Sequence, residues 1–199
     1  SRQVLFSGIG EEGQRKLSNS YAVIIGCGAL GTIIATSLVR AGVGTVRIID
    51  RDFIEYHNLQ RQVLFNEDDI RNELPKAVAA ERHLKKVNSS IEVEGIVADV
   101  NYTNIAQLIG DAEIILDALD NFETRLLIND FSLKNKIPWI YGGAISSFGM
   151  TMTIIPDETP CFRCFSPSSA RGIVLTCDTA GVISPAPTII GSFQVAEAM

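Results

Sequence analysis

The chain has 199 residues, of which 46% are apolar and 20% charged, the ordinary composition of one globular domain with a sizeable core. Its formal net charge of −6 argues against nucleic acid as the main partner, because nucleic-acid binding normally needs a basic surface. Four cysteines, with no disulfide-type spacing and no targeting segment, indicate metal or thiol chemistry in a reducing compartment, so we expect a cytoplasmic protein.

A glycine loop follows the first predicted strand, 21–26. The sequence Gly-Cys-Gly-Ala-Leu-Gly, with glycines at 26, 28 and 31, then opens a helix-periodic stretch, and this context is what a nucleotide-binding fingerprint requires. Gly26 would allow the tight turn, Gly28 the close approach of backbone to phosphate, and Gly31 the packing of helix on strand. The uncharged run 21–39 is long enough for a membrane span, but its three glycines favour strand, loop and helix instead.

A carboxylate and two cations follow the glycine loop. Asp50 ends the second predicted strand, 45–50, where a carboxylate accepts hydrogen bonds from ribose hydroxyls. Up to that point an NAD-dependent dehydrogenase is an equally good interpretation. Arg61 and Lys76 then favour a triphosphate, because an arginine fork and a lysine point charge are the usual ligands of phosphate oxygens. Since the chain as a whole is acidic, these cations and helix N-termini must supply the attraction.

Strands and helices alternate along the rest of the chain. We expect strands at 21–26, 45–50, 91–98, 112–118, 138–143 and 150–155, and helices at 9–18, 31–41, 75–87, 103–109 and 122–135. This order predicts an α/β fold with a doubly wound, mostly parallel sheet of Rossmann type. Gly28, Asp50 and Asp120 should then converge at the switch point beyond the carboxyl ends of the strands. Residues 156–187, rich in Pro, Ser, Cys and Gly, are expected to form an irregular annex with an antiparallel extension and a crossover loop before a final helix.

Several short motifs occur together in one order along the chain. They are Arg2-Gln3, the glycine loop, Asp-Arg-Asp at 50–52, Asn-Leu-Gln-Arg-Gln at 58–62, Pro-Lys at 75–76, Leu-Asp-Asn at 119–121, Cys-Phe-Arg-Cys at 161–164 and Cys-Asp-Thr-Ala-Gly-Val at 177–182. Together they resemble the MoeB/ThiF/HesA adenylyltransferases, bacterial relatives of ubiquitin-activating enzymes. The resemblance implies one adenylation domain over 1–199. It further implies ATP-dependent adenylation of the C-terminal glycine carboxylate of a small ubiquitin-like sulfur carrier, in molybdopterin or thiamin type sulfur transfer, with release of pyrophosphate.

The resemblance also implies roles for individual residues. Nucleotide-binding roles fall on Gly26, Gly28, Gly31, Asp50, Asp52, Asn58, Arg61, Lys76 and Asn121. Catalytic roles fall on Arg61, Lys76, Asp120, Arg2 and Cys177. Asp120 would hold Mg²⁺, and Arg2 would reach into the partner's site of a homodimer. For Asp52, assistance near the phosphates and capping of the next turn are equally weighted. No general base is needed, because a carboxylate is already a nucleophile at neutral pH.

The cysteines allow two further assignments. By the resemblance, Cys161 and Cys164 are half of a structural Zn²⁺ site, and since zinc wants four ligands, the other two are expected beyond this chain, which we take to be a fragment. Cys177 matches a cysteine that in some relatives is linked covalently to the carrier or handles sulfur. An inert cysteine is an equal alternative there, because thiol reactivity depends on pKa and exposure.

Alternative functions from two other classes stay open at this point. The first is an NAD-dependent oxidoreductase, which the glycine loop and Asp50 would equally serve. The second is a non-catalytic scaffold that binds ATP and a carrier tail. A peptidyl-nucleotide synthetase is a more distant possibility. The sequence identifies neither the pathway nor the carrier protein, which is expected to end in Gly-Gly. Asp117, a carboxylate within an apolar strand, is left unassigned.

Overall fold

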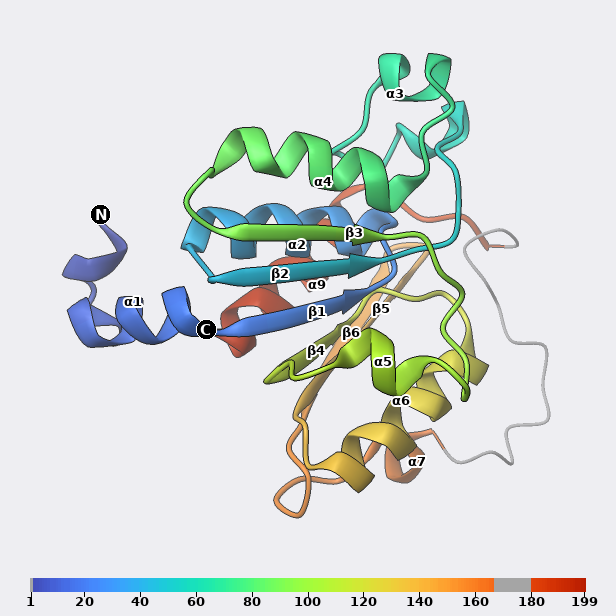
Figure 1. The fold of residues 1–199 in the computed structure, drawn as a ribbon. Coiled ribbons are helices and arrows are strands. Elements are labelled where there is room, and N and C mark those ends of the chain that lie inside the picture. The colour runs from blue at the N-terminus through green and yellow to red at the C-terminus, as the bar shows by residue number, and fades with distance from the viewer. Residues whose placement is uncertain (1, 167–179) are drawn as a thin grey trace.

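The computed structural model describes residues 2–166 and 180–199, which form one sheet covered by helices on both faces (Figure 1). The strands are β1 (Tyr21–Ile25), β2 (Thr45–Ile49), β3 (Glu92–Ile96), β4 (Ile114–Asp117), β5 (Trp139–Ile145) and β6 (Phe148–Ile154). The helices are η1 (Gln3–Leu5), α1 (Gly10–Asn19), α2 (Ala29–Ala41), η2 (Tyr56–Asn58), α3 (Glu67–Arg71), α4 (Lys76–Val87), α5 (Ile105–Ile109), α6 (Phe122–Asn135), α7 (Phe162–Phe165) and α9 (Pro185–Ala198).

The sheet has the strand order β3-β2-β1-β4-β5-β6. The first five of these strands pair in parallel, and β6 pairs antiparallel with β5. The chain order reverses between β1 and β4, so this is the switch point at which ligands of doubly wound sheets lie. The predicted fold class is therefore confirmed. The antiparallel strand is β6, which precedes the annex 156–187 where the extension was expected, and residues 167–179, in which the crossover loop was expected, lie outside the described residues.

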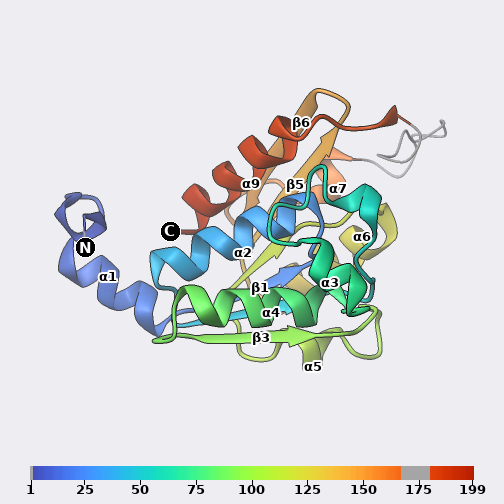
Figure 2. The same ribbon diagram turned by 90° about the horizontal axis from the view of Figure 1, so that it is seen from above.

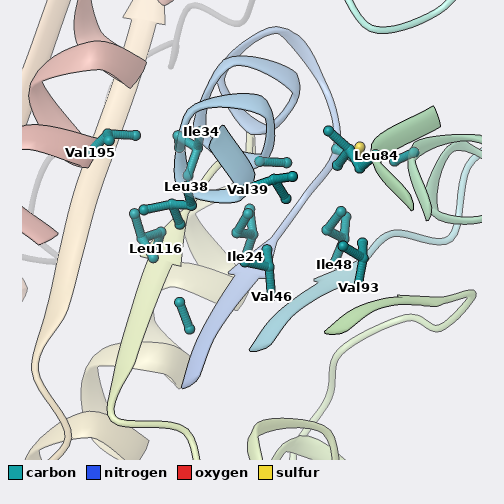
Figure 3. Close-up of a cluster of buried hydrophobic side chains, with 14 of the residues drawn as sticks. Ile24, Ile34, Leu38, Val39, Val46, Ile48, Leu84, Val93, Leu116 and Val195 are labelled. Atoms are coloured by element: carbon teal, nitrogen blue, oxygen red, sulfur yellow. The ribbon is translucent and has the colours of Figure 1, made fainter. Parts of the chain in front are cut away.

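Alternating residues of the central strands supply two hydrophobic cores. In β1, Ala22 and Ile24 pack toward α2, α4 and α9, whereas Val23 and Ile25 pack toward α5, α6 and α7. Figure 3 shows Ile24 in the first core, among side chains that come from the sheet and from these helices. Figure 2 shows α2 lying between α4 and α9 over that face. Because helices cover both faces of the sheet, the central strands are buried on two sides and their sequences are nearly continuous apolar runs.

Element boundaries differ from the predicted ones mainly in the annex. The described part of 156–187 contains the short helix α7, and α9 already begins at Pro185, with proline at a first-turn position that suits it. The one-turn helices α3 and α7 were not expected, because five residues or fewer are too short for a helical period to show. Strand β5 extends to Ile145 because it continues into a hairpin with β6.

The uncharged run 21–39 divides into β1, the glycine loop and most of α2. Within 2–166 and 180–199, no helix is long and apolar enough to cross a membrane. The expectation of a strand, a loop and a helix in this run is thus confirmed.

Candidate nucleotide site

A cavity of about 800 Å³ lies beyond the carboxyl ends of the central strands. Most of the predicted nucleotide residues line it: Gly26, Gly28, Asp50, Asp52, Asn58, Arg61, Lys76, Asp120 and Asn121. They arrive from the loops that follow β1, β2 and β4 and from the start of α4. The fold thus brings together residues that lie far apart in the sequence.

The glycine loop packs so closely that side chains are excluded from it. Gly26 has φ +99°, and a Cβ there would lie 2.5 Å from the Ala118 carbonyl oxygen. A Cβ on Gly31 would lie 2.2 Å from the Gly26 carbonyl oxygen, so Gly31 allows helix α2 to pack directly against the backbone of the turn. Gly31 itself does not line the cavity. Gly28 is the N-cap of α2 and has no capping side chain. The first N–H groups of this helix are therefore suited to an anion, as the fingerprint requires.

Asp50 is fixed at the end of β2 by two backbone donors. Its Oδ2 accepts from the Cys27 N–H at 2.6 Å and its Oδ1 from the Asp52 N–H at 2.7 Å. Burial raises the pKa of Asp50 above the ordinary carboxyl value, while Lys76 and the two backbone donors act in the opposite direction. The carboxylate is thus held beside the glycine loop, where it suits a ribose.

Lys76 is a buried cation at the start of α4. Its side chain is 9% exposed, and its Nζ lies 3.0 Å from Asp52 Oδ2. The backbone also joins these segments, because the Lys76 N–H donates to the Asp52 carbonyl at 2.8 Å. Asp52 itself is 57% exposed, so water can solvate it while it orients the lysine. The Asp52 carboxylate thus pairs with Lys76, and within the described residues it accepts no backbone hydrogen bond of the kind that would cap the next turn.

Asn58 and Arg61 belong to the loop that carries η2. Asn58 is buried, and its Oδ1 accepts from the Glu55 N–H at 3.0 Å, so its oxygen shapes the loop. Arg61 donates from Nη1 to the His57 carbonyl at 3.1 Å. In the part of the chain that the structure describes, no carboxylate lies within ion-pair distance of Arg61. Arg61 is consequently the cavity cation most available to a ligand.

Asp120 and Asn121 lie in the loop between β4 and α6. Asp120 is exposed at the cavity, and the Asn121 Oδ1 accepts from the Thr124 N–H at 2.9 Å, which makes Asn121 the N-cap of α6. The side-chain oxygen of Asn121 is therefore engaged in the fold.

Carboxylates and cations crowd this cavity in comparable numbers. The carboxylates that line it are those of Asp50, Asp52, Glu55, Asp99 and Asp120, and the cations are Arg51, Arg61, Lys76 and Arg125. Arg51 pairs with Asp99 at 2.9 Å, and Arg125 pairs with the buried Asp117. A polyanion entering such a site would need further positive charge. Within the described residues no cluster of three or more His, Cys, Asp or Glu could hold a metal ion. Mg²⁺ fits a single carboxylate such as Asp120, because it is usually held by one or two carboxylates together with substrate phosphates.

The remaining predicted site residues lie outside the cavity lining. Arg2 is exposed beside η1, and Figure 1 shows the N-terminal segment at the opposite end of the strands from the cavity. Cys161 and Cys164 lie at α7 with their Sγ atoms 3.7 Å apart. Cys177 falls outside the described residues.

Some lining residues were missed by the sequence reasoning. Gln62 is buried beside Gly28, and Arg125 and Tyr141 reach the cavity from α6 and β5. Gln62 directly follows Arg61 in the motif at 58–62, which was a usable signal. Arg125 had no such signal, because its partner Asp117 is found only through the fold.

A family model described as the ThiF family matches residues 1–199. The chain belongs to the ThiF family. A sulfur carrier protein ThiS adenylyltransferase of Bacillus subtilis is 54% identical over 199 residues, covering 100% of this chain and 59% of that protein. The molybdopterin-synthase adenylyltransferase of Escherichia coli is 34% identical over 200 residues, covering 100% of this chain and 79% of that protein.

Solved structures agree with this membership. The E. coli protein MccB, in a crystal structure with ATP, has a TM-score of 0.81 and 28% identity, covering 93% of this chain and 56% of MccB. The chain thus spans 59% of the B. subtilis relative and 56% of MccB. The resemblance to the MoeB/ThiF type is confirmed at the level of family and fold.

Proposed function

We propose that this ThiF-family chain carries the ATP-dependent adenylation of the C-terminal carboxylate of a small ubiquitin-like sulfur carrier, with release of pyrophosphate. The observation that carries the proposal is the single cavity in which the glycine loop, Asp50, Arg61, Lys76 and Asp120 meet. Two relatives that match the whole chain support the same reaction by their names: one is a sulfur carrier protein ThiS adenylyltransferase and the other a molybdopterin-synthase adenylyltransferase.

Each residue of this cavity has a definite task in the proposal. Asp50 accepts from the ribose, the N-terminus of α2 faces the phosphates, and Arg61 and Lys76 stabilise the charge of the departing pyrophosphate. Mg²⁺, when bound near Asp120, supplies positive charge that neutralises phosphate oxygens. The incoming carboxylate needs no general base, so catalysis consists of positioning and charge neutralisation.

The β5–β6 side of the cavity supports a carrier with a Gly-Gly end. Gly143, Ala144 and Gly149 line this wall among larger side chains, which include Ile145, Phe148 and Met150. Gly149 is required by packing, since a Cβ there would lie 2.3 Å from Ile190 Cγ1 of α9. An extended tail without side chains could approach the backbone at the two glycines and Ala144. ATP itself is supported by the ATP-bound MccB structure.

The test is ATP–pyrophosphate exchange with and without a carrier that ends in Gly-Gly. We expect exchange that depends on both the carrier and Mg²⁺, and a loss of about ten- to a hundredfold in Asp120→Asn, because one charged contact is worth about 1.5–3 kcal/mol. Asp157→Asn, an exposed carboxylate paired with Lys136, is the matched control and should retain exchange. Selective binding of NAD over ATP in calorimetry would instead favour the oxidoreductase. Carrier binding without pyrophosphate release would favour the scaffold.

The homodimer with Arg2 acting across it is part of the same proposal. It is supported by the position of the N-terminal segment, which Figure 1 shows at the opposite end of the strands from the carboxyl ends where the cavity lies. We expect Arg2→Ala and Lys76→Ala to be nearly inactive alone and to regain about a quarter of the exchange when mixed, because some heterodimers then contain one intact site. Sedimentation checks the dimer. A fully active monomer would remove this role for Arg2.

The zinc half-site also stays a proposal. Two thiolates on one tetrahedral Zn²⁺ would lie roughly 3.8 Å apart at Zn–S distances of about 2.3 Å, and the Sγ atoms of Cys161 and Cys164 lie 3.7 Å apart. Burial alone would raise the pKa of Cys161, but hydrogen bonds from the backbone and thiol of Cys164, the Arg163 N–H and the Asn129 side chain together lower it, which favours the thiolate. Zinc analysis of a longer chain tests the site, and absence of the metal there would contradict it.

A further inference from the structure

The parallel strands β4 and β5 separate at the cavity. Their pairing comprises Ile115 with Trp139 and Leu116 with Ile140. Beyond this point Ala118 and Tyr141 line the cavity from either side. Backbone groups at such an opening lose their ladder partners and must be satisfied otherwise.

One buried ion pair binds the backbone on both sides of this opening. Arg125 Nε lies 2.9 Å from Asp117 Oδ2, and the side chains are 6% and 0% exposed. Arg125 Nη2 donates to the carbonyls of Leu119 and Gly142, the latter at 2.9 Å. Asp117 in turn accepts from the N–H of Leu119, at 2.8 Å to Oδ1. The two side chains thus hold the N–H and the carbonyl of Leu119 on one side of the opening and the carbonyl of Gly142 on the other.

The helix layer on the other face of the sheet fixes the same opening. Gln194 of α9 donates from Nε2 to the Asp117 carbonyl at 2.7 Å and to the Ile140 carbonyl at 3.1 Å. A Cβ on Gly142 would lie 2.2 Å from Gln194 Oε1, so the glycine and the glutamine are in close contact. Side chains from both helix layers therefore hold the separation between β4 and β5, which is not a loosely packed edge of the sheet.

A purely stabilising role explains this arrangement poorly. Burying an ion pair costs desolvation, and well-packed apolar residues are often as stable or more stable in its place. Apolar residues could not supply the three hydrogen bonds that this pair makes to the backbone of Leu119 and Gly142. Leu119 directly precedes Asp120, and the Arg125 guanidinium, which lines the cavity, lies 5.0 Å from the centre of the Tyr141 ring.

We propose that the Asp117–Arg125 pair is a positioning device for the adenylation reaction: by binding the backbone at Leu119 and at Gly142, it sets the Asp120 carboxylate and the β5 wall of the cavity, where Tyr141 and Gly143 lie, at a fixed separation. This inference rests on the proposed function. The pair acts on Asp120 through the backbone of the preceding residue, Leu119, because Asp117 accepts from the Leu119 N–H and Arg125 donates to the Leu119 carbonyl. The two sides of the cavity that would receive the nucleotide and the carrier tail would thereby be fixed relative to each other before either ligand binds.

The test uses Arg125→Lys, which keeps the charge and loses the fork. We expect the Mg²⁺ concentration for half-maximal exchange to rise about tenfold and turnover to fall by about ten- to a hundredfold, because small misplacements at a reacting centre are costly. The affinity for adenosine, which needs Asp50 rather than Asp120, should change less than about twofold. Binding of Mn²⁺ in the presence of a non-hydrolysable ATP analogue can be measured by electron paramagnetic resonance and requires no turnover. In Arg125→Lys this binding should weaken by a factor similar to that for the Mg²⁺ requirement.

Arg47→Lys is the matched control. Arg47 also pairs with a carboxylate, Glu94 at 2.5 Å, donates to the Leu108 carbonyl at 2.8 Å and lies over the Tyr21 ring, but it lies outside the cavity lining. It should leave the Mg²⁺ dependence unchanged. An unchanged Mg²⁺ dependence in Arg125→Lys as well, in the presence of normal wild-type exchange, would overturn the inference and leave the proposed function standing.

A measurement on the unmodified protein covers the case in which Arg125→Lys does not fold. Amide hydrogen exchange of Leu119 should be slow without nucleotide or metal, because Asp117 holds this N–H group in advance. Fast exchange that slows only when Mg²⁺ and the ATP analogue bind would overturn the inference. Absence of carrier-dependent exchange in the wild type would instead count against the proposed function, whatever the Leu119 amide shows.

Discussion

Lys76→Ala is expected to lower ATP–pyrophosphate exchange by about ten- to a hundredfold, because a charged hydrogen bond is worth about 1.5–3 kcal/mol and each 1.4 kcal/mol is tenfold. Lys76 is a buried cation of the cavity, oriented by Asp52 at 3.0 Å and held by the backbone at the first turn of α4. The loss should fall on turnover more than on folding, since Asp52 remains 57% exposed and solvated without it. Exchange kinetics together with thermal unfolding measure the two effects separately.

Lys85→Ala is the control from the same helix. Lys85 is exposed and paired with Glu81 four residues earlier, at 2.5 Å. Such surface pairs contribute little, so exchange and stability should both stay near wild type. If exchange persisted in both Lys76→Ala and Asp120→Ala, the roles proposed for these residues would be wrong.

Gly31→Ala is expected to destabilise the fold by about 3 kcal/mol, because overpacking typically costs 1–3 kcal/mol and here meets backbone. Its Cβ would lie 2.2 Å from the Gly26 carbonyl oxygen and 3.3 Å from Ala118 Cβ. Helix α2 would have to move away from the turn, so nucleotide binding should weaken as well. Thermal unfolding should show a midpoint lower by about 6–12 °C, at 2–4 °C per kcal/mol for a chain of this size.

Gly13→Ala is the corresponding control on a helical glycine. Its Cβ would meet only the Ile9 side chain, at 3.1 Å to Cγ2, and α1 is distant from the cavity. Alanine is the better helix former by about 0.8–1.0 kcal/mol, so this change should be neutral or stabilising. A Gly31→Ala protein as stable as Gly13→Ala would refute the packing argument for the glycine loop.

Local patterns carried much of the prediction. The run from Tyr21 through the glycines to α2 gave strand, turn and helix, because each is encoded by neighbouring residues and their spacing. Asp50 and Asp120 could be assigned to one edge of the sheet, since each ends or follows a parallel strand. The helix 122–135 was predicted with its observed bounds.

Other features of the site depended on contacts that no local pattern encodes. Asp117 was an unassigned carboxylate until the fold brought Arg125 to it, although only eight positions separate them in the sequence. The side-chain oxygens of Asn58 and Asn121 shape loops, a use that the motif does not distinguish from ligand binding. Gln62 is buried against the glycine loop because two loops from different strands meet there.

The sequence by itself determined the fold class, the family and the residue types at the switch point, because these follow from periodicity, spacing and the order of motifs. Only the tertiary structure decided which charges are paired and which is available. It left Arg61 without a carboxylate within ion-pair distance in the described chain, paired Lys76 with Asp52, and placed the N-terminal segment at the opposite end of the strands from the cavity. The physical reason is that a charge's role depends on burial and on neighbours within a few ångströms, which are set by the packing of distant segments.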